Sequence, residues 1–150
     1  MRRIFHDYRL PENLVYLSIV ESNLNPTARS RANALGIWQF MRHTGRAFDL
    51  NQSWWHEDRY DPIKSTHAAA KYLTSLHRQF SGDWELALAA YNSGAGRVRG
   101  AQKKARRLKK STQYWNLDLP KETRGYVPAF YAVANLFSDL NKYGFEPVAP

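Results

Sequence analysis

Glu21 is the first residue of this sequence whose position suggests chemistry. Leu10, Leu14, Leu17, Glu21 and Leu24 follow one another at spacings of four, three, four and three residues. That spacing places them on one stripe of a helix, so a carboxyl group stands where an apolar side chain is expected. A carboxylate in such a position is costly to bury unless it is paired, hydrogen-bonded or protonated.

Burial raises the pKa of a carboxyl group, because the charged form loses its solvation. A carboxyl group that keeps its proton near neutral pH can act as a general acid. Glu21 is therefore a candidate acid catalyst. The stripe alone is also compatible with a glutamate at a helix end that reaches solvent past Leu24, or with one that pairs with a buried arginine.

Three later segments bring amides, phenols and glycines together, namely Gly36-Ile37-Trp38-Gln39, Ala90-Tyr91-Asn92-Ser93-Gly94 and Glu122-Thr123-Arg124-Gly125-Tyr126-Val127. Amide and phenol groups donate and accept hydrogen bonds, and aromatic faces offer apolar platforms. These properties suit the hydroxyl groups, N-acetyl groups and rings of sugars. Taken singly, each segment is also typical of ordinary helix packing and capping.

Helices must position these residues, because no segment alternates apolar and polar residues for long enough to predict a strand. The first half of the chain predicts a largely buried helix that ends near Asn25-Pro26. The elements predicted there are a helix that Pro11-Glu12 opens, a loop over 26–35, one or two helical turns from Gly36 to Met41, an interruption at Thr44-Gly45 and another turn from Arg46 to Leu50.

Capping signals define the helices of the second half. Asp61-Pro62 is typical of a helix start, with Asp as N-cap and Pro in the first turn, and Asp83 predicts a second start. Pro120 to Glu122 opens a last helix toward Leu140. Further boundary signals are Ser81-Gly82, which ends one helix, Gly94 and Gly96, which break the next, and Pro128, which kinks or restarts the last.

The composition predicts one folded domain with a basic surface. Of 150 residues, 43% are hydrophobic and 14% aromatic, which is enough for a packed core and excludes wholesale disorder. The chain has 22 Lys and Arg against 13 Asp and Glu, a formal net charge of +9. Six of these cations lie between Lys103 and Lys110, within the basic stretch 97–113, for which no structure is predicted. Such a surface attracts nucleic acid, anionic lipid or anionic wall polymer, and charge alone does not choose among them.

Several site classes are disfavoured. The chain has no cysteine, so no disulfide, thiol nucleophile or cysteine-based zinc site is possible. Its five histidines do not form a His-Glu-x-x-His motif, which disfavours a zinc site. We expect neither a metal nor a cofactor. No run of apolar residues is long enough for a transmembrane helix. The N-terminus is basic but lacks the apolar segment of an export signal.

Taken together and in this order, the motifs resemble the SLT domain of lytic transglycosylases, the lysozyme-like glycosidases that cleave peptidoglycan, and in pattern the membrane-bound D type. The resemblance covers about Pro11 to Leu140. It implies a mainly α fold, with residues 1–150 as a single lysozyme-like catalytic domain whose core is about 11–140 and whose cleft surrounds the catalytic Glu.

The resemblance also implies roles for individual residues. Glu21, in the pair Glu21-Ser22, corresponds to the catalytic acid and base of the family. Tyr91 would lie close to it. Residues that correspond to substrate-binding or cleft positions are Ser30, Gly36, Gln39, Met41, Tyr91, Asn92, Glu122 and Tyr126.

The sequence departs from the family in one loop and in its extent. Arg42 stands where many members have proline, so the geometry of that loop can differ. The lipid-attached N-terminus and the C-terminal wall-binding repeats of the membrane-bound relatives are not recognised here. We therefore expect a catalytic core or a minimal member.

A mechanism with one carboxyl group is favoured, because no Asp or Glu occurs between Glu21 and Asp49. Most glycosidases use two such groups. The resemblance implies that Glu21 protonates the oxygen between MurNAc and GlcNAc, that the N-acetyl group of the substrate stabilises the positive centre, and that Glu21 then deprotonates the MurNAc 6-hydroxyl to close a 1,6-anhydro ring.

Two alternative functions stay open at this point. A goose-type muramidase would hydrolyse the same bond with water, and would need a base such as Asp49, Asp58 or Asp61 near Glu21. A non-catalytic module that binds wall polymer or another polyanion would explain the charge. No nucleic-acid-binding motif is recognised.

The partner expected from the resemblance is the glycan strand of peptidoglycan, without nucleic acid and without a membrane-spanning segment in this chain. We expect a monomer that acts in the periplasm or cell envelope of a bacterium. The sequence does not decide whether Trp54-Trp55 and Trp115 are exposed or buried. These residues could form platforms for sugar rings, or they could pack under a loop.

Overall fold

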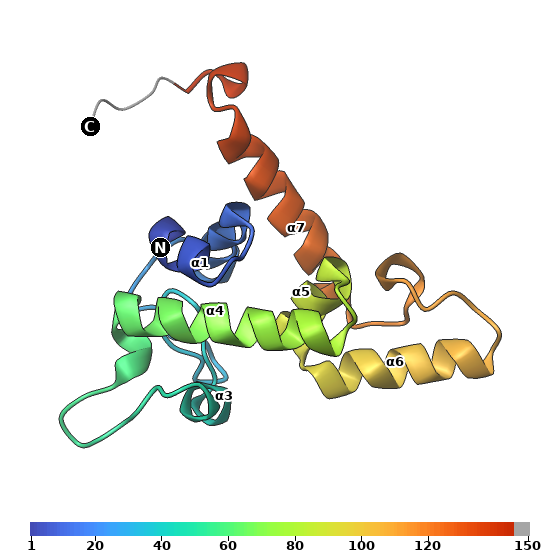
Figure 1. The fold of residues 1–150 in the computed structure, drawn as a ribbon, viewed down its shortest axis with the longest axis horizontal. Coiled ribbons are helices and arrows are strands. Elements are labelled where there is room, and N and C mark those ends of the chain that lie inside the picture. Colours follow the sequence, from blue (N-terminus) through green and yellow to red (C-terminus); the bar gives the residue numbers. More distant parts are fainter. Residues whose placement is uncertain (146–150) are drawn as a thin grey trace.

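The computed structural model describes residues 1–145, and these form helices joined by turns and loops, with long connections before and after the helix Arg42–Ala47 (Figure 1). The α-helices are α1 (Arg2–Asp7), α2 (Leu17–Ser22), α3 (Arg42–Ala47), α4 (Pro62–Gln79), α5 (Trp84–Ser93), α6 (Ala95–Arg107) and α7 (Lys121–Ser138). Short 3-10 helices are η1 (Glu12–Tyr16), η2 (Asp58–Tyr60), η3 (Tyr114–Asn116) and η4 (Asn141–Tyr143). Strand pairing within residues 1–145 is limited to isolated bridges, so the predicted mainly α fold is confirmed.

The predicted caps of α4 and α5 are confirmed. The Asp61 carboxylate accepts hydrogen bonds from the backbone N–H groups of Ile63 and Lys64, which the first helical turn leaves without partners. The Asp83 carboxylate accepts one from Leu86 in the same way. These caps fix where the two helices begin.

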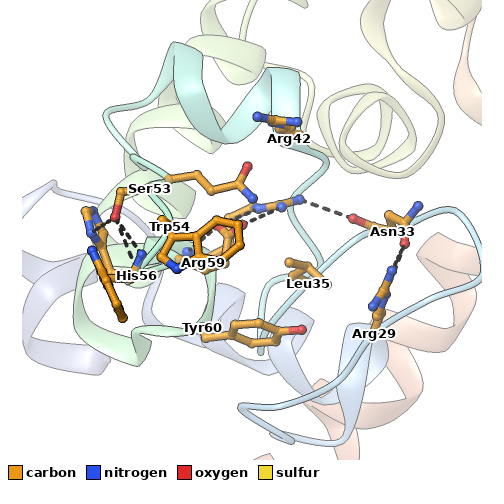
Figure 2. A pocket seen from close by; sticks show the side chains of 12 residues that line it. Arg29, Asn33, Leu35, Arg42, Ser53, Trp54, His56, Arg59 and Tyr60 are labelled. Carbon is orange, nitrogen blue, oxygen red and sulfur yellow. Dashed lines mark hydrogen bonds and ion pairs between the residues drawn. The ribbon is translucent and has the colours of Figure 1, made fainter.

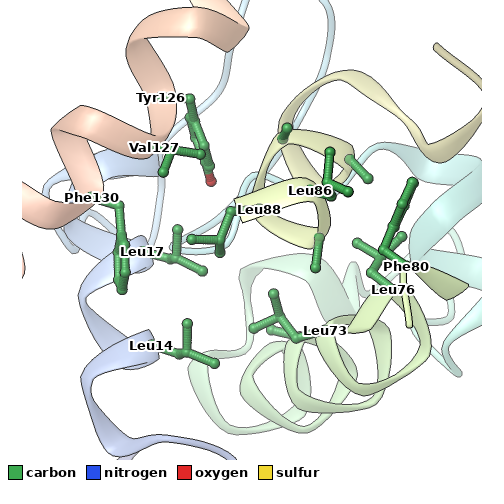
Figure 3. Close-up of a cluster of buried hydrophobic side chains, with 14 of the residues drawn as sticks. Leu14, Leu17, Leu73, Leu76, Phe80, Leu86, Leu88, Tyr126, Val127 and Phe130 are labelled. Atoms are coloured by element: carbon green, nitrogen blue, oxygen red, sulfur yellow. The ribbon is translucent and has the colours of Figure 1, made fainter. Parts of the chain in front are cut away.

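The core forms around α5, which packs against α4, α6 and α7. Its alanines are fully buried, and their small side chains let the neighbouring helices approach closely. Figure 3 shows leucines of η1, α2, α4 and α5 in one cluster of buried side chains that also includes Val127 and Phe130 of α7. Phe5 of α1 is also fully buried and stacks on Trp38, with ring centroids 5.4 Å apart. The packed core therefore begins earlier than Pro11.

Two predictions about the 36–50 region are wrong. The segment from Gly36 to Met41 is not helical: it is a tight turn closed by an antiparallel bridge between Leu35 and Phe40. Gly36 has a φ of +75° and Gln39 a φ of +48°, and neither value is compatible with a right-handed helix. Thr44-Gly45 was predicted to interrupt the helical structure, but both residues lie inside α3. Gly45 there allows close packing against the side chain of Arg59.

The other corrections concern glycine and proline in the second half. Gly94 ends α5 as predicted, whereas Gly96 lies inside α6, which forms over much of the basic stretch. Pro128 lies within α7 and does not interrupt it. Proline lacks the N–H group that would bind the carbonyl oxygen of Arg124, and the Tyr114 hydroxyl donates to that oxygen instead, at 2.8 Å. A tertiary contact thus satisfies the group that Pro128 leaves free.

No helix in the described part of the chain, residues 1–145, combines the length and apolar character that crossing a membrane requires.

Candidate active site

A cleft of about 700 Å3 lies between α2, the loop before α3, the end of α5 and the start of α7. Side chains from sequence positions far apart meet in it because α5 and α7 pack on each other and α2 packs on α7. Of the residues predicted to form the site, all except Gly36 line this cleft: Glu21, Ser30, Gln39, Met41, Tyr91, Asn92, Glu122 and Tyr126.

Glu21 lies in the last turn of α2, which ends at Asn23 in a left-handed conformation. The hydroxyl of Tyr126, on α7, donates a hydrogen bond to Glu21 Oε1. Burial raises the pKa of Glu21 from its ordinary value of 4.5 to about 7; the Tyr126 hydrogen bond acts in the opposite direction, and the negative charge of Glu122 adds to the rise. Near neutral pH this carboxyl group can therefore both give up and accept a proton.

Tyr91 occupies a different position from that of Tyr126. Its hydroxyl donates to the backbone carbonyl of Trp38 at 2.9 Å, which ties the end of α5 to the 36–40 turn. Burial and the nearby negative charge of Glu21 raise the pKa of the Tyr91 phenol well above its ordinary value. The charge of Glu21 thus affects the Tyr91 phenol, but the hydrogen bond to Glu21 comes from Tyr126.

Asn92 and Glu122 face each other across the cleft rim. The Asn92 side-chain amide donates to Glu122 Oε1 at 3.1 Å, which connects α5 to the first turn of α7. Glu122 is exposed to solvent and, among the lining residues, is the only acidic one besides Glu21.

The loop before α3 contributes Gln39, Ser30 and Met41. The Gln39 amide nitrogen donates to the carbonyl of Gly36 at 2.8 Å, which orients the amide at the cleft wall. The Ser30 hydroxyl accepts a hydrogen bond from the Ala34 backbone at 3.0 Å and so holds the preceding turn. Met41 is partly exposed and presents an apolar surface to the cleft.

Gly36, predicted as a substrate-binding residue, does not line the cleft. A Cβ atom at this position would lie 1.9 Å from the backbone oxygen of Arg59. Together with its positive φ, this close approach explains why glycine stands there. Gly36 therefore shapes the turn that carries Gln39.

Sequence reasoning missed Tyr72 of α4, which lines the cleft wall beside Tyr91. Their ring centroids are 5.2 Å apart, and Phe40 completes the aromatic group at 6.2 Å from Tyr72. Tyr72 does not belong to the apolar stripe of α4. A large aromatic residue outside that stripe could have indicated a cleft position. His43 and Thr44 of α3 also line the cleft and carried no such signal.

Ser22, the residue after Glu21, connects α2 to the cleft loop. Its hydroxyl lies 3.0 Å from the carbonyl oxygen of Ile37 and 3.1 Å from that of Ser18. The contact to Ile37 fixes the 36–40 turn against the helix that carries Glu21. Ser22 is therefore a positioning residue for both walls of the cleft.

The aspartates considered as a second catalytic carboxylate all lie outside the cleft. Asp49 pairs with Lys71 at 2.6 Å, and Asp58 pairs with Lys64 at 2.7 Å. Asp61 caps α4. None of them is placed to activate a water molecule beside Glu21.

The chain is similar to known proteins in sequence and in fold. The model of the transglycosylase SLT domain family matches residues 5–114. Membrane-bound lytic murein transglycosylase D of Escherichia coli (strain K12) is 45% identical over 135 residues, which is 90% of this chain. This chain spans only about 30% of the length of that curated relative.

Two solved structures share the fold. A lytic transglycosylase Slt from Pseudomonas aeruginosa, in an inactive mutant with a glutamate replaced by glutamine, gives a TM-score of 0.68 at 25% identity over 99% of this chain and 24% of its own. The 70 kDa soluble lytic transglycosylase from Escherichia coli gives 0.65 at 26% identity over 91% of this chain and 24% of its own. The family model ends before α7, whereas the first superposition extends over nearly the whole chain.

Proposed function

Because this chain belongs to the transglycosylase SLT domain family, we propose that it is a peptidoglycan lytic transglycosylase domain with Glu21 as its sole acid and base. The bond cleaved is the β-1,4 linkage between MurNAc and GlcNAc. The product carries a 1,6-anhydroMurNAc end.

The observation that carries this proposal is the state of Glu21 in the cleft. Its pKa of about 7 lets a single carboxyl group serve as acid in one step and as base in the next. The other acid of the cleft, Glu122, is exposed and hydrogen-bonded to Asn92. A mechanism that needs two carboxyl groups close to the scissile bond is therefore less well supported. The inactivity of the glutamate-to-glutamine mutant of the structural relative agrees with a carboxyl catalyst.

In the first step, protonated Glu21 donates its proton to the glycosidic oxygen, and the bond between that oxygen and C1 of MurNAc breaks. The GlcNAc unit leaves with a free hydroxyl group. Positive charge develops at C1, where the carbonyl oxygen of the substrate N-acetyl group stabilises it, as in other substrate-assisted glycosidases. Tyr126 holds Glu21 Oε1 in place during this step.

In the second step, Glu21 is ionised and removes the proton from the MurNAc 6-hydroxyl. The oxygen of that hydroxyl attacks C1 and closes the anhydro ring. Glu21 ends the cycle protonated, so no water is consumed and the carboxyl group returns to its starting state.

We assign the remaining cleft residues to the glycan strand. Gln39, Ser30 and Asn92 offer amide and hydroxyl groups to N-acetyl and hydroxyl substituents, and Tyr91 and Met41 offer apolar surface to sugar rings. Glu122 maintains the rim through Asn92 and adds negative charge near Glu21.

The proposed cellular setting follows from the substrate. Peptidoglycan lies in the bacterial cell envelope, so we propose that the domain acts there, in the periplasm or elsewhere in the envelope. We also propose that residues 1–150 form a single catalytic domain and that the protein is a monomer. Nucleic acid is not part of the proposed function.

Mass spectrometry of the soluble products released from purified sacculi tests the proposal. Muropeptides that end in 1,6-anhydroMurNAc are the expected result. Products heavier by one water, with reducing MurNAc ends, would mean hydrolysis and would direct attention to Glu122 as a base. An absence of soluble products would contradict the proposed activity of the domain by itself.

A further inference from the structure

A second pocket, of about 600 Å3, lies beside a pair of exposed tryptophans. The side chains of Trp54 and Trp55 are 89% and 88% exposed, so packing under a loop does not explain either of them. Exposed indoles forgo the free energy that burial would release, and exposed apolar surface of this kind marks interaction sites. The two tryptophans therefore form a candidate surface for binding a ligand.

The tryptophans occupy the tip of a pinned turn. The Ser53 hydroxyl lies 2.6 Å from His56 Nδ1 and accepts hydrogen bonds from the backbone N–H groups of Trp55 and His56. The Ser53 backbone N–H donates to the carbonyl of His56 at 2.9 Å, and a bridge between Gln52 and Glu57 closes the base. The turn thus fixes the backbone from which both indoles project, so the chain loses less backbone freedom on binding.

The opposite wall of the pocket is cationic. Glu57 is neutralised by a bidentate pair with buried Arg59, both contacts 2.8 Å long, and this pair holds the pKa of Glu57 below its ordinary value. Arg29 hydrogen-bonds only to the neutral amide of Asn33, and no carboxylate within residues 1–145 forms an ion pair with Arg29 or Arg42. With Arg29, Arg42 and Arg59 against Glu57, the pocket carries a net positive charge.

The pocket and the cleft share the loop that precedes α3. Residues of this loop alternate between the two: Ser30, Ala32 and Ala34 line the cleft, whereas Arg29, Asn33 and Leu35 line the tryptophan pocket. Figure 2 shows Trp54 facing the loop that carries Leu35 and Asn33. Arg59 joins the two sides, since its guanidinium donates to the carbonyls of Asn33 and Phe40 at 3.1 Å. A polymer bound in the cleft can thus reach the pocket across one loop.

We propose that this pocket is an accessory site for the peptide-bearing units of peptidoglycan, an inference that rests on the proposed function for the identity of the polymer. Trp54 and Trp55 contact a sugar ring, and Arg29 and Arg42 pair with carboxylates of the attached peptide. An uncharged glycan supplies only the first of these contacts, so the site favours strands that carry peptides.

Binding measured in the Glu21→Gln background tests this site without cleavage. The probes are intact sacculi, a soluble GlcNAc-MurNAc-tetrapeptide and an uncharged GlcNAc trimer. We expect Trp54→Ala combined with Trp55→Ala to weaken binding of the tetrapeptide probe by about tenfold or more, as truncation of aromatic anchors does at other binding sites. Arg29→Gln combined with Arg42→Gln should weaken tetrapeptide binding several-fold, reduce its salt dependence and leave trimer binding unchanged.

Two control variants match these changes in chemistry but lie outside the pocket. Trp115→Ala removes another exposed tryptophan, which is 57% exposed in η3. Arg106→Gln combined with Arg107→Gln removes the same charge from α6. Both controls should bind the tetrapeptide probe within about twofold of the parent, and unchanged melting temperatures should show that all variants fold.

Equal losses of tetrapeptide binding in the pocket variants and their controls would overturn the proposal. Binding would then depend only on the net charge or overall apolarity of the protein surface. Unchanged tetrapeptide binding in the tryptophan variant would overturn it as well. So would pocket variants that lose binding to a DNA duplex but keep binding to the tetrapeptide probe, because the pocket would then recognise nucleic acid. If the wild-type protein releases no product from sacculi while the pocket variants still lose binding, the proposed reaction fails and the accessory site stands.

Discussion

The Tyr126 hydroxyl donates a hydrogen bond to Glu21 Oε1, and this contact joins α7 to α2 across 105 residues of sequence. It stabilises the ionised form of a carboxyl group whose burial favours the protonated form. The opposing effects leave the pKa of Glu21 near the pH at which it would work. The same contact makes the proposed chemistry sensitive to changes in either helix.

Replacement of Glu21 by glutamine should abolish cleavage while the fold persists. The amide keeps the shape of the side chain but has no proton to transfer, so we expect turnover to fall by about a thousandfold or more. Release of soluble muropeptides from sacculi measures this loss. A variant that cleaves at an appreciable rate would show that Glu21 is not the acid.

The pH dependence of stability should differ between wild type and Glu21→Gln. The folded state keeps a proton on Glu21 up to about pH 7, whereas the unfolded chain releases it near pH 4.5. The stabilisation from Glu21 is therefore complete below pH 4.5 and is lost as the pH rises through about 7, which amounts to about 3 kcal/mol. Urea unfolding of both proteins at pH 4 to 8 measures the difference, and parallel curves would contradict the raised pKa.

Tyr126→Phe should move the basic limb of the kcat/KM profile to higher pH. The Tyr126 hydrogen bond lowers the pKa of Glu21, so its loss raises that pKa and keeps Glu21 protonated further into the alkaline range. We also expect a rate at the optimum about tenfold to a hundredfold lower, because the carboxyl group loses its orientation. A lower rate without any shift of the limb would indicate that Tyr126 only packs.

Glu122→Gln should move the same limb in the opposite direction. The negative charge of Glu122 raises the pKa of Glu21, so its removal lets Glu21 ionise at lower pH. Glutamine can still accept the hydrogen bond from Asn92, and the rim should therefore keep its structure. A pH series of initial rates with the two variants side by side tests both signs, and shifts in the same direction would refute this account of the site.

Gly36→Ala should destabilise the protein strongly. The added Cβ would lie 1.9 Å from the Arg59 carbonyl oxygen, at a residue whose φ is +75°. We expect a loss of about 3 kcal/mol or more in the free energy of unfolding. Gly100→Ala is the matched control, because Gly100 lies in α6 with no atom within 4 Å of the added Cβ, and alanine there should stabilise the helix by about 0.5–1 kcal/mol. Equal effects in denaturant unfolding would contradict the close approach at Gly36.

Features that depend on neighbouring residues could be predicted from the sequence. The starts of α4 and α5 were predicted because Asp61 and Asp83 cap backbone groups only two or three residues away. Glu21 stood out because an apolar stripe has a fixed period and a carboxyl group on it is costly. The order of the motifs further predicted the family and most of the cleft.

The tertiary structure alone decided which groups act together. Pro128 lies inside an unbroken helix because Tyr114 satisfies the carbonyl of Arg124, and Gly36 is required by a backbone that lies 23 positions further along the sequence, at Arg59. Likewise, the phenol that hydrogen-bonds to Glu21 belongs to Tyr126 and not to Tyr91. The exposure of Trp54 also became known only from the structure. Local periodicity and caps act within a few residues, whereas pKa values, close approaches and exposure depend on which distant segments pack together.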